Sequence, residues 1–247
     1  MIKENIRRVF AGAGFQLYRS ENILYVPEDV MMKAYLMKAA CCIKDSVRTV
    51  FDVGANVGTF SGFASSLFPE ADIYSFEPVA DTYKTLNENS KHKNKLYPFN
   101  IAFGSGREEN KKIFRKKDSQ WNSLANNDSW YQDENNFELI QVDTIDHFMS
   151  ENKIAALEIL KTDTEGYDLQ VLKGAEKALT ENRIKIIVCE VAFNKEDIQH
   201  SYFNEIQDYL FPKGFRVFGF TGLQAAYKFQ NKMGIGYCNC LFLNSDN

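Results

Sequence analysis

The chain has 247 residues, of which 45% are hydrophobic and 25% are charged. This composition is typical of an ordinary globular protein and excludes a disordered or fibrous chain. The formal net charge of -4 disfavours a general nucleic-acid binder, because non-specific affinity for phosphates depends on positive surface charge. We therefore expect a small-molecule or carbohydrate substrate and no nucleic-acid partner.

The cysteines and histidines predict neither a zinc site nor a disulfide framework. The 5 cysteines are adjacent or alternating, without a C-x-x-C pair, and the 3 histidines are scattered. The first residues lack the apolar core of a signal peptide, and no apolar run approaches the roughly 20 residues of a membrane span. We therefore expect a cytoplasmic protein without a membrane span. We interpret His92, His147 and His200 as surface or capping residues.

The first half of the chain alternates between strand and helix patterns. Short apolar runs are followed by segments with apolar residues at i, i+3, i+4 and i+7, which is the spacing of a helix face. This order predicts a doubly wound α/β domain over residues 49–247 with a mostly parallel sheet, and residues 1–48 are predicted to form a helical extension over its mouth. The predicted elements are helices at 29–44, 60–67 and 79–89, and strands at 49–53, 73–76 and 96–103.

The alternation continues after a polar segment at 104–137. This segment is charged and rich in asparagine, so we interpret it either as a substrate-side insertion that contributes to a lid or as a surface excursion. Gly174 is expected to permit close packing inside a helix that places Leu169, Leu172, Ala175 and Leu179 on one face. The last two strands predict an antiparallel edge of the sheet. The other predicted elements are strands at 139–142, 157–162, 184–189, 215–220 and 238–243, and helices near 144–149 and 202–210.

A glycine-rich turn joins the first strand to the helix that follows it, in the sequence VFDVGANVGTF. Glycine is needed where the backbone takes a positive φ or approaches a ligand, and the start of a helix offers N–H groups. The spacing Gly54-x-Asn56-x-Gly58 differs from the G-x-G-x-x-G of dinucleotide sites, because the last glycine comes one residue earlier. The turn therefore predicts a nucleotide-like ligand without a pyrophosphate.

Two acids accompany this turn. Glu77 ends the second strand, 23 positions after Gly54, where a carboxylate accepts hydrogen bonds from ribose hydroxyls. Asp52 lies two residues before the turn and either orients it or reaches the ammonium group of a methionine moiety. The turn and Glu77 together are a more specific signal for such a ligand than the turn alone.

Six blocks of the sequence occur in a fixed order: VFDVGANVGTF, Phe76-Glu77-Pro78, Asn100-Ile101-Ala102, Val142-Asp143-Thr144-Ile145-Asp146, LKTDTEGYDLQVLKGA and Cys189-Glu190-Val191. Together they resemble the FkbM family of methyltransferases. The resemblance implies a class I methyltransferase fold with a seven-stranded sheet, S-adenosylmethionine as methyl donor, and O-methylation of a hydroxyl on a sugar, a polyketide or a related metabolite. Residues 1–48 and 104–137 match the family poorly, and we expect the identity of the substrate to reside there. The residues implied to bind the donor are Asp52, Gly54, Ala55, Asn56, Gly58, Thr59 and Glu77, with Asn100 or Ile101 beside the adenine.

Three further acids follow the strands of the second half. Asp163 and Glu165 come after the strand at 157–162, and Glu190 comes after the strand at 184–189. Because ligands of open α/β sheets bind at the carboxyl ends of the strands, we expect all three beside the donor. An alcohol is a poor nucleophile until it loses its proton, and a placed base contributes about 10²–10⁴-fold to the rate. We interpret Asp163 or Glu165 as this base and the other acids as holding neighbouring hydroxyls.

Two other interpretations of these acids stay open. Thr162-x-x-Glu165 has the form of a capping box for the next helix, which would make Glu165 a structural residue. Asp163 and Glu190 also offer the oxygen ligands that Mg²⁺ prefers, and a bound metal would lower the pKa of a substrate hydroxyl. A site without metal is the favoured interpretation.

Other functions and acceptors also stay open. A nicotinamide-dependent oxidoreductase shares the strand-turn-helix and the strand-end acid, but the pyrophosphate spacing is missing here. A non-catalytic protein that binds S-adenosylmethionine would keep the donor pocket alone. The leading acceptor is a hydroxyl of a sugar, in a nucleotide-activated sugar or a surface glycan. Clustered carboxylates suit vicinal hydroxyls, and the basic run at 111–117 suits a diphosphate, although such a run is more typical of a solvated edge strand.

Overall fold

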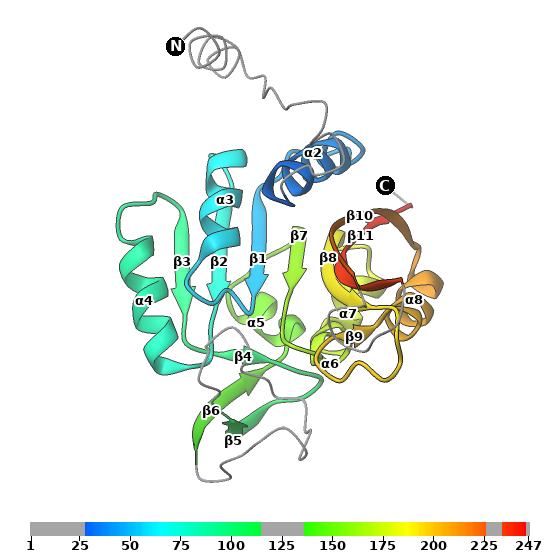
Figure 1. Ribbon diagram of the computed structural model, residues 1–247. Helices are drawn as coiled ribbons and strands as arrows, with labels where there is room; N and C mark the ends of the chain where they lie inside the picture. The colour runs from blue at the N-terminus through cyan, green and yellow to red at the C-terminus, as the bar shows by residue number, and fades with distance from the viewer. Residues whose placement is uncertain (1–27, 115–135, 226–233, 246–247) are drawn as a thin grey trace, which may run out of the picture.

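The main sheet has the order β10-β11-β8-β7-β1-β2-β3, with a short strand β9 paired to β8 (Figure 1). The computed structural model describes residues 28–114, 136–225 and 234–245. Strands β3, β2, β1, β7 and β8 are parallel, and β11 is antiparallel to both of its neighbours, as the sequence predicted. The strands are β1 (Thr49–Val53), β2 (Asp72–Phe76), β3 (Leu96–Phe99), β7 (Leu157–Thr162), β8 (Ile184–Ala192), β9 (Ser201–Tyr202), β10 (Phe215–Ala225) and β11 (Ile235–Asn244).

Helices cover both faces of this sheet because its central strands are apolar on both sides. Val50 packs with side chains of α2 and α3, whereas Phe51, its neighbour in β1, packs with side chains of α5 to α8. Asp52 and Lys161 therefore lie on the same face as α3, at the ends of β1 and β7. The helices are α2 (Glu28–Ala40), α3 (Thr59–Leu67), α4 (Ala80–Ser90), α5 (Ile145–Glu151), α6 (Asp168–Lys173), α7 (Glu176–Thr180), α8 (Phe203–Leu210) and the 3₁₀ turn η3 (Phe211–Lys213).

The predicted strand at 96–103 is wrong, because the chain leaves the main sheet after β3. The Asn100 side-chain amide donates to the carbonyls of Glu77 and Pro78, at 2.9 and 2.8 Å, and turns the chain there. The following strand β4 (Ala102–Phe103) belongs to a second sheet, in the order β4-β6-β5, with β5 (Glu108–Phe114) and β6 (Phe137–Asp143). This small sheet lies at the end of the main sheet to which β1 and β2 point (Figure 1).

The single helix predicted over Leu169 to Leu179 is also wrong, because it is divided into α6 and α7. The Gly174 carbonyl accepts the Asp146 N–H at 3.0 Å instead of continuing the helical ladder. The Asp146 carboxylate accepts the N–H groups of Lys177 and Ala178, so it caps the new helix. The close packing expected at Gly174 is confirmed, because a Cβ there would lie 2.1 Å from the Gly104 carbonyl oxygen.

Parts of two predictions lie outside the described residues: residues 1–27 of the predicted N-terminal extension, and residues 115–135 of the polar segment. The polar segment contains β5, which carries Lys111 and Lys112, but residues 115–135 are not described, so the lid interpretation stays a prediction.

The 5 cysteines are free thiols, as expected. Among the described residues, no helix has both the length and the apolar character of a membrane span.

Candidate active site

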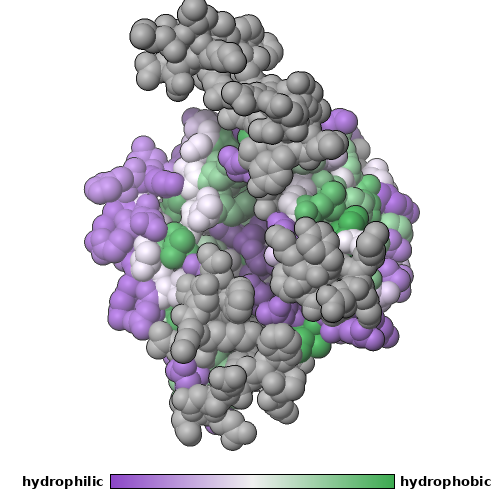
Figure 2. All heavy atoms as spheres, in the orientation of Figure 1, coloured by the Kyte–Doolittle hydropathy of each residue, from purple (hydrophilic) through white to green (hydrophobic). Residues whose placement is uncertain are grey.

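A cavity of about 630 Å³ opens beyond the carboxyl ends of β1, β2, β7 and β8. It is bounded by the glycine turn, by the start of α3, by the β7–α6 loop and, at Asp29 and Met32, by α2. In the space-filling view, hydrophilic residues gather in the middle of this face between two hydrophobic areas (Figure 2). The cavity therefore has the amphipathic lining that is expected of a small-molecule site.

The glycine turn has the backbone conformation that its sequence predicts. Gly54, Asn56 and Gly58 all have positive φ, of 74°, 50° and 89°, and asparagine is among the residues that tolerate this region best. A Cβ on Gly54 would lie 1.9 Å from the Asp163 carbonyl oxygen, so only glycine permits the contact with the end of β7. The N–H groups of Gly54 and Ala55 donate to the Phe76 carbonyl, which fixes the turn to β2.

Asp52 orients the glycine turn through buried contacts and does not line the cavity. Its side chain is fully buried, accepts the Ser61 hydroxyl at 2.5 Å and lies 3.2 Å from the ammonium of Lys161. This placement favours the first of its two predicted roles. Gly58 and Asn100 likewise lie outside the cavity lining, whereas Ala55, Thr59 and Ile101 are part of it.

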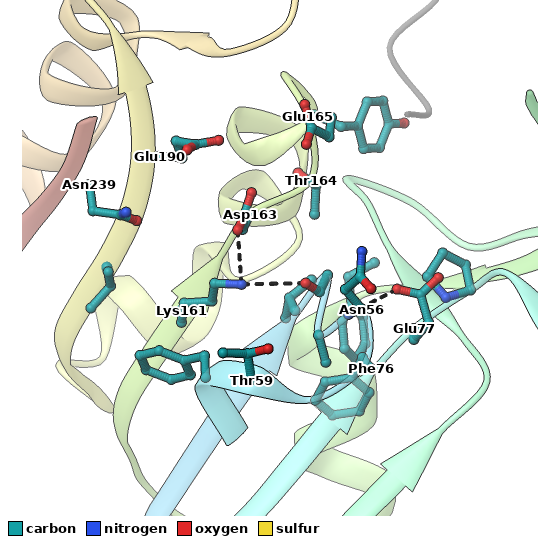
Figure 3. A pocket seen from close by; sticks show the side chains of 18 of the residues that line it. Asn56, Thr59, Phe76, Glu77, Lys161, Asp163, Thr164, Glu165, Glu190 and Asn239 are labelled. Carbon is teal, nitrogen blue, oxygen red and sulfur yellow. Dashed lines mark hydrogen bonds and ion pairs between the residues drawn. The ribbon is translucent and has the colours of Figure 1, made fainter. Parts of the chain in front are cut away.

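Lys161 is a central residue of the site that the sequence analysis missed. Its ammonium lies 3.2 Å from both Asp52 Oδ1 and Asp163 Oδ2, and it donates to the Gly54 carbonyl at 3.3 Å (Figure 3). Burial disfavours the charged ammonium, but the carboxylates of Asp163 and Asp52 outweigh it and raise the pKa of Lys161. A lysine inside a strand whose residues are all buried was the signal for a paired charge.

Glu77 faces the cavity from the end of β2. Its carboxylate accepts the N–H groups of Asn56 and Val79, at 3.1 and 2.9 Å (Figure 3). Burial raises the pKa of Glu77 to about 7, although these two N–H bonds oppose the shift. Beside it, Ile101 and Phe103 contribute an apolar wall to the cavity.

The three acids that the sequence selected lie together on the other side of the cavity. Carboxylate oxygens of Asp163, Glu165 and Glu190 lie within 4.8 Å of one another (Figure 3). Burial and the charges of Asp163 and Glu165 raise the pKa of Glu190 well above its ordinary value. Repulsion among the acids is relieved in part by Lys161, which pairs with Asp163.

The capping box that was the structural alternative for Glu165 is not formed. Helix α6 begins after Tyr167, without a side-chain cap, and Thr162 is still inside β7. The Asp168 carboxylate instead accepts the Thr164 N–H at 3.1 Å. Glu165 has a positive φ of 53° in the connecting loop, which aims this loop at the cavity.

The interpretation of His200 as a surface or capping residue is wrong. Its side chain is 9% exposed and lines the cavity, where Nε2 lies 3.6 Å from Glu190 Oε2. The loop after β8 places it there, and its ring stacks on Tyr237 of β11 with centroids 4.0 Å apart. No pattern in the sequence indicated this position, because aspartate, which stands three positions earlier as Asp197, is a common turn residue.

The chain is similar in sequence to known methyltransferases. The family model described as the methyltransferase FkbM domain matches residues 52–217. Over 150 residues the chain is 25% identical to the hexuronic acid methyltransferase AglP of Haloferax volcanii, covering 60% of this chain and 59% of that relative. The chain thus spans less than two thirds of the length of this relative.

Comparison with solved structures shows the same fold. The methyltransferase FkbM of Methylobacillus flagellatus KT superposes with a TM-score of 0.51 at 15% identity, over 80% of this chain and 43% of that one. The methyltransferase domain of METTL16 has a TM-score of 0.51 at 10% identity, over 97% of this chain and 75% of that one. The fold is therefore that of the class I methyltransferases.

Proposed function

The chain belongs to the FkbM methyltransferase family, and from this premise we propose that it is an S-adenosylmethionine-dependent O-methyltransferase acting on a hydroxyl of a sugar or glycan. The family match over residues 52–217 removes the oxidoreductase alternative. One observation carries the finer proposal: the glycine turn with Glu77, and the acids Asp163, Glu165 and Glu190, line the same cavity. A donor half and a proton-accepting half thus face each other.

The residues of the donor half fit S-adenosylmethionine. When bound, this molecule supplies an electrophilic methyl carbon on a sulfonium sulfur. The Glu77 carboxylate suits the ribose hydroxyls, and the wall formed by Ile101 and Phe103 suits the adenine. Gly54 keeps the turn close to β7, which leaves room over Thr59 and Ala55 for the methionine part.

The acidic half favours a neutral hydroxyl over an anionic acceptor group. Among the described residues that line the cavity, Lys161 is the only lysine or arginine, and it already pairs with Asp52 and Asp163. A carboxylate acceptor would lie beside Asp163 and Glu165 without a further lysine or arginine, and like charges in such a site repel strongly. Vicinal hydroxyls of a sugar instead donate hydrogen bonds to these acids.

The relative from Haloferax volcanii supports a sugar as the substrate class. Its name states that it methylates a hexuronic acid. A hexuronic acid carries both hydroxyls and a carboxylate, and the acidic lining described above favours transfer to a hydroxyl. The product is then an ether, which resists mild alkali, rather than an ester, which does not.

Calorimetry followed by a product assay tests this proposal. We expect the protein to bind S-adenosylhomocysteine and not NAD, and to transfer a methyl group to methyl glycosides of glucose or glucuronic acid as an alkali-stable ether. Absence of affinity for S-adenosylhomocysteine would remove the donor site. Affinity without a methylated product from a broad panel of glycosides would favour a non-catalytic binding protein.

The variant Asp163→Asn tests the acidic half separately. Asparagine keeps the shape of the side chain but removes the charge that faces the acceptor. We expect turnover to fall by about 10²-fold or more while the affinity for S-adenosylhomocysteine changes less than about threefold. Turnover within threefold of the unmodified protein would exclude Asp163 from the chemistry and leave Glu165 and Glu190.

A further inference from the structure

His200 occupies the middle of a row of three polar groups that ends in the cavity. Its Nδ1 lies 3.1 Å from both carboxylate oxygens of Asp197, and its Nε2 lies 3.6 Å from Glu190 Oε2. The row is well enclosed, because the side chains of Asp197 and Glu190 are each only 17% exposed. A carboxylate, an imidazole and a second carboxylate in this order are arranged as proton-transfer groups usually are.

The ring of His200 is held in one orientation. Tyr237 stacks on it at an interplanar angle of 13°. The Asp197 carboxylate is itself fixed, because Oδ1 accepts the N–H groups of Gln199 and His200 at 2.9 and 3.1 Å. The ring therefore keeps one edge toward Asp197 and the other toward Glu190.

The partner of Nδ1 determines which nitrogen carries the proton. Burial raises the pKa of Asp197, but the hydrogen bonds that its carboxylate accepts from the His200 ring and from the backbone N–H groups of Gln199 and His200 help to bring the pKa below its ordinary value. An ionised carboxylate only accepts, so Nδ1 must be the donor. In the neutral ring Nε2 then has the free electron pair, and this pair is directed to Glu190 and the cavity.

Glu190 is the group that connects this histidine to the acceptor. Acids on two elements, the β7–α6 loop and α6, disfavour the ionised form of its carboxylate. One cation on β7 favours the ionised form. Burial and these acids raise the pKa of Glu190, so that it holds a proton more firmly than an ordinary glutamate. The charged or titratable groups around it are Asp163, Glu165, Asp168, Lys161 and His200.

We propose that His200, positioned by Asp197, is the final acceptor of the proton that leaves the substrate hydroxyl, and that Glu190 passes it on. The hydroxyl oxygen forms its bond to the methyl carbon while the carbon–sulfur electron pair leaves with sulfur. The hydroxyl proton moves to the Glu190 carboxyl group, and the proton of Glu190 moves to Nε2 of His200. The imidazolium that results is stabilised by the Asp197 carboxylate. This inference rests on the proposed O-methyl transfer.

The ring nitrogens of His200 are directly measurable, because the chain contains only 3 histidines. Nitrogen-15 NMR of the protein saturated with S-adenosylhomocysteine distinguishes the two neutral tautomers, and the variant His200→Gln assigns the signals. We expect a proton on Nδ1 and none on Nε2. A proton on Nε2 instead would overturn the proposal, because the ring would then have no electron pair toward Glu190.

Kinetics supply a second readout with a matched control. His147 also has Nδ1 on a carboxylate, 2.8 Å from Asp143 Oδ2, but it lies outside the cavity lining. With methyl glucuronide as the acceptor, we expect His200→Gln to lower kcat by about 10²–10⁴-fold and to change the acidic limb of its pH profile, with the affinity for S-adenosylhomocysteine retained. We expect His147→Gln to leave the rate unchanged.

The outcomes separate this inference from the proposed function. A rate of His200→Gln within threefold of the unmodified protein would contradict the relay while leaving O-methyl transfer intact. If the unmodified protein binds S-adenosylhomocysteine but methylates no glycoside, the proposed function fails, and the NMR measurement still decides which nitrogen of His200 faces Glu190.

Discussion

Lys161 Nζ lies 3.2 Å from Asp163 Oδ2, which connects the buried end of β7 to an acid that lines the cavity. The same ammonium is shared with Asp52 beneath the glycine turn. One lysine thus neutralises the donor half and the acidic half of the site together. This explains how the sheet tolerates a fully buried aspartate at the end of β1.

We predict that Lys161→Met destabilises the fold by about 3–5 kcal/mol, because Asp52 is left buried without its cation. The free energy of unfolding in urea measures this change. The matched control is Lys84→Met, since Lys84 pairs with Asp81 on the surface, where both side chains are more than half exposed. Its expected effect is below about 1 kcal/mol.

A compensating variant makes this prediction specific. Adding Asp52→Asn to Lys161→Met removes the uncompensated charge and is expected to restore a large part of the lost stability. Equal unfolding free energies for Lys161→Met and Lys84→Met would show that the buried ion pair has no such role.

The affinity for S-adenosylhomocysteine is predicted to increase as the pH rises from 6 to 8. The pKa of Glu77 is about 7, and only the ionised carboxylate accepts both ribose hydroxyls. At pH 6 about a tenth of Glu77 is ionised, so we expect the dissociation constant at pH 6 to be roughly five- to tenfold larger than at pH 8. Calorimetry at three pH values measures this slope.

The variant Glu77→Gln is the control for this slope. We expect it to bind S-adenosylhomocysteine more weakly at every pH and with little pH dependence. The stability of the ligand-free protein changes with pH in the opposite direction. The folded state holds the Glu77 proton more tightly than the unfolded state, so the contribution of Glu77 to stability decreases between pH 4.5 and about 7. A flat binding profile in the unmodified protein would rule out Glu77 as the ribose acceptor.

The order of the elements was predictable because the buried parallel strands are continuous apolar runs. The runs at β1, β7 and β8 are apolar on both faces, and each is followed by a helix pattern. The division of the predicted strand at 96–103 into β3 and β4 was not predictable, because this segment is apolar except at Asn100. Its interruption depends on hydrogen bonds from the Asn100 amide to carbonyls at the end of β2.

The site was predictable to the extent that its residues follow strands directly. Glu77, Asp163 and Glu190 each come at or just after the last residues of a parallel strand, so the topology alone brings them together. His200 enters from a loop that returns over the sheet before β9, and no spacing in the sequence reports this return. The positions of Asp197 and Glu190 on opposite sides of its ring depend on this tertiary arrangement.

The variant Gly54→Ala is predicted to abolish binding of S-adenosylhomocysteine. The new Cβ would lie 1.9 Å from the Asp163 backbone oxygen at a φ of 74°, so the turn must move away from β7. We also expect a loss of stability above about 1 kcal/mol. Gly106→Ala is the control, because nothing lies within 4 Å of a Cβ there. Retained affinity in Gly54→Ala would mean that the turn does not form the donor site.

The acidic cluster is predicted to work without a divalent cation. Three carboxylates within 4.8 Å resemble a metal site, but Asp163 is already paired with Lys161, and burial and the neighbouring acids raise the pKa of Glu190, so that it holds a proton more firmly than an ordinary glutamate. A metal would have to displace that proton and compete with a fixed ammonium, and metal ligands must be deprotonated to bind. Calorimetric titration with MgCl₂ is therefore expected to give no saturable heat, and methyl transfer should survive extensive chelation. Activity that is lost with EDTA and restored by Mg²⁺ would show instead that the cluster is a metal site, and the proton would then leave a metal-bound hydroxyl.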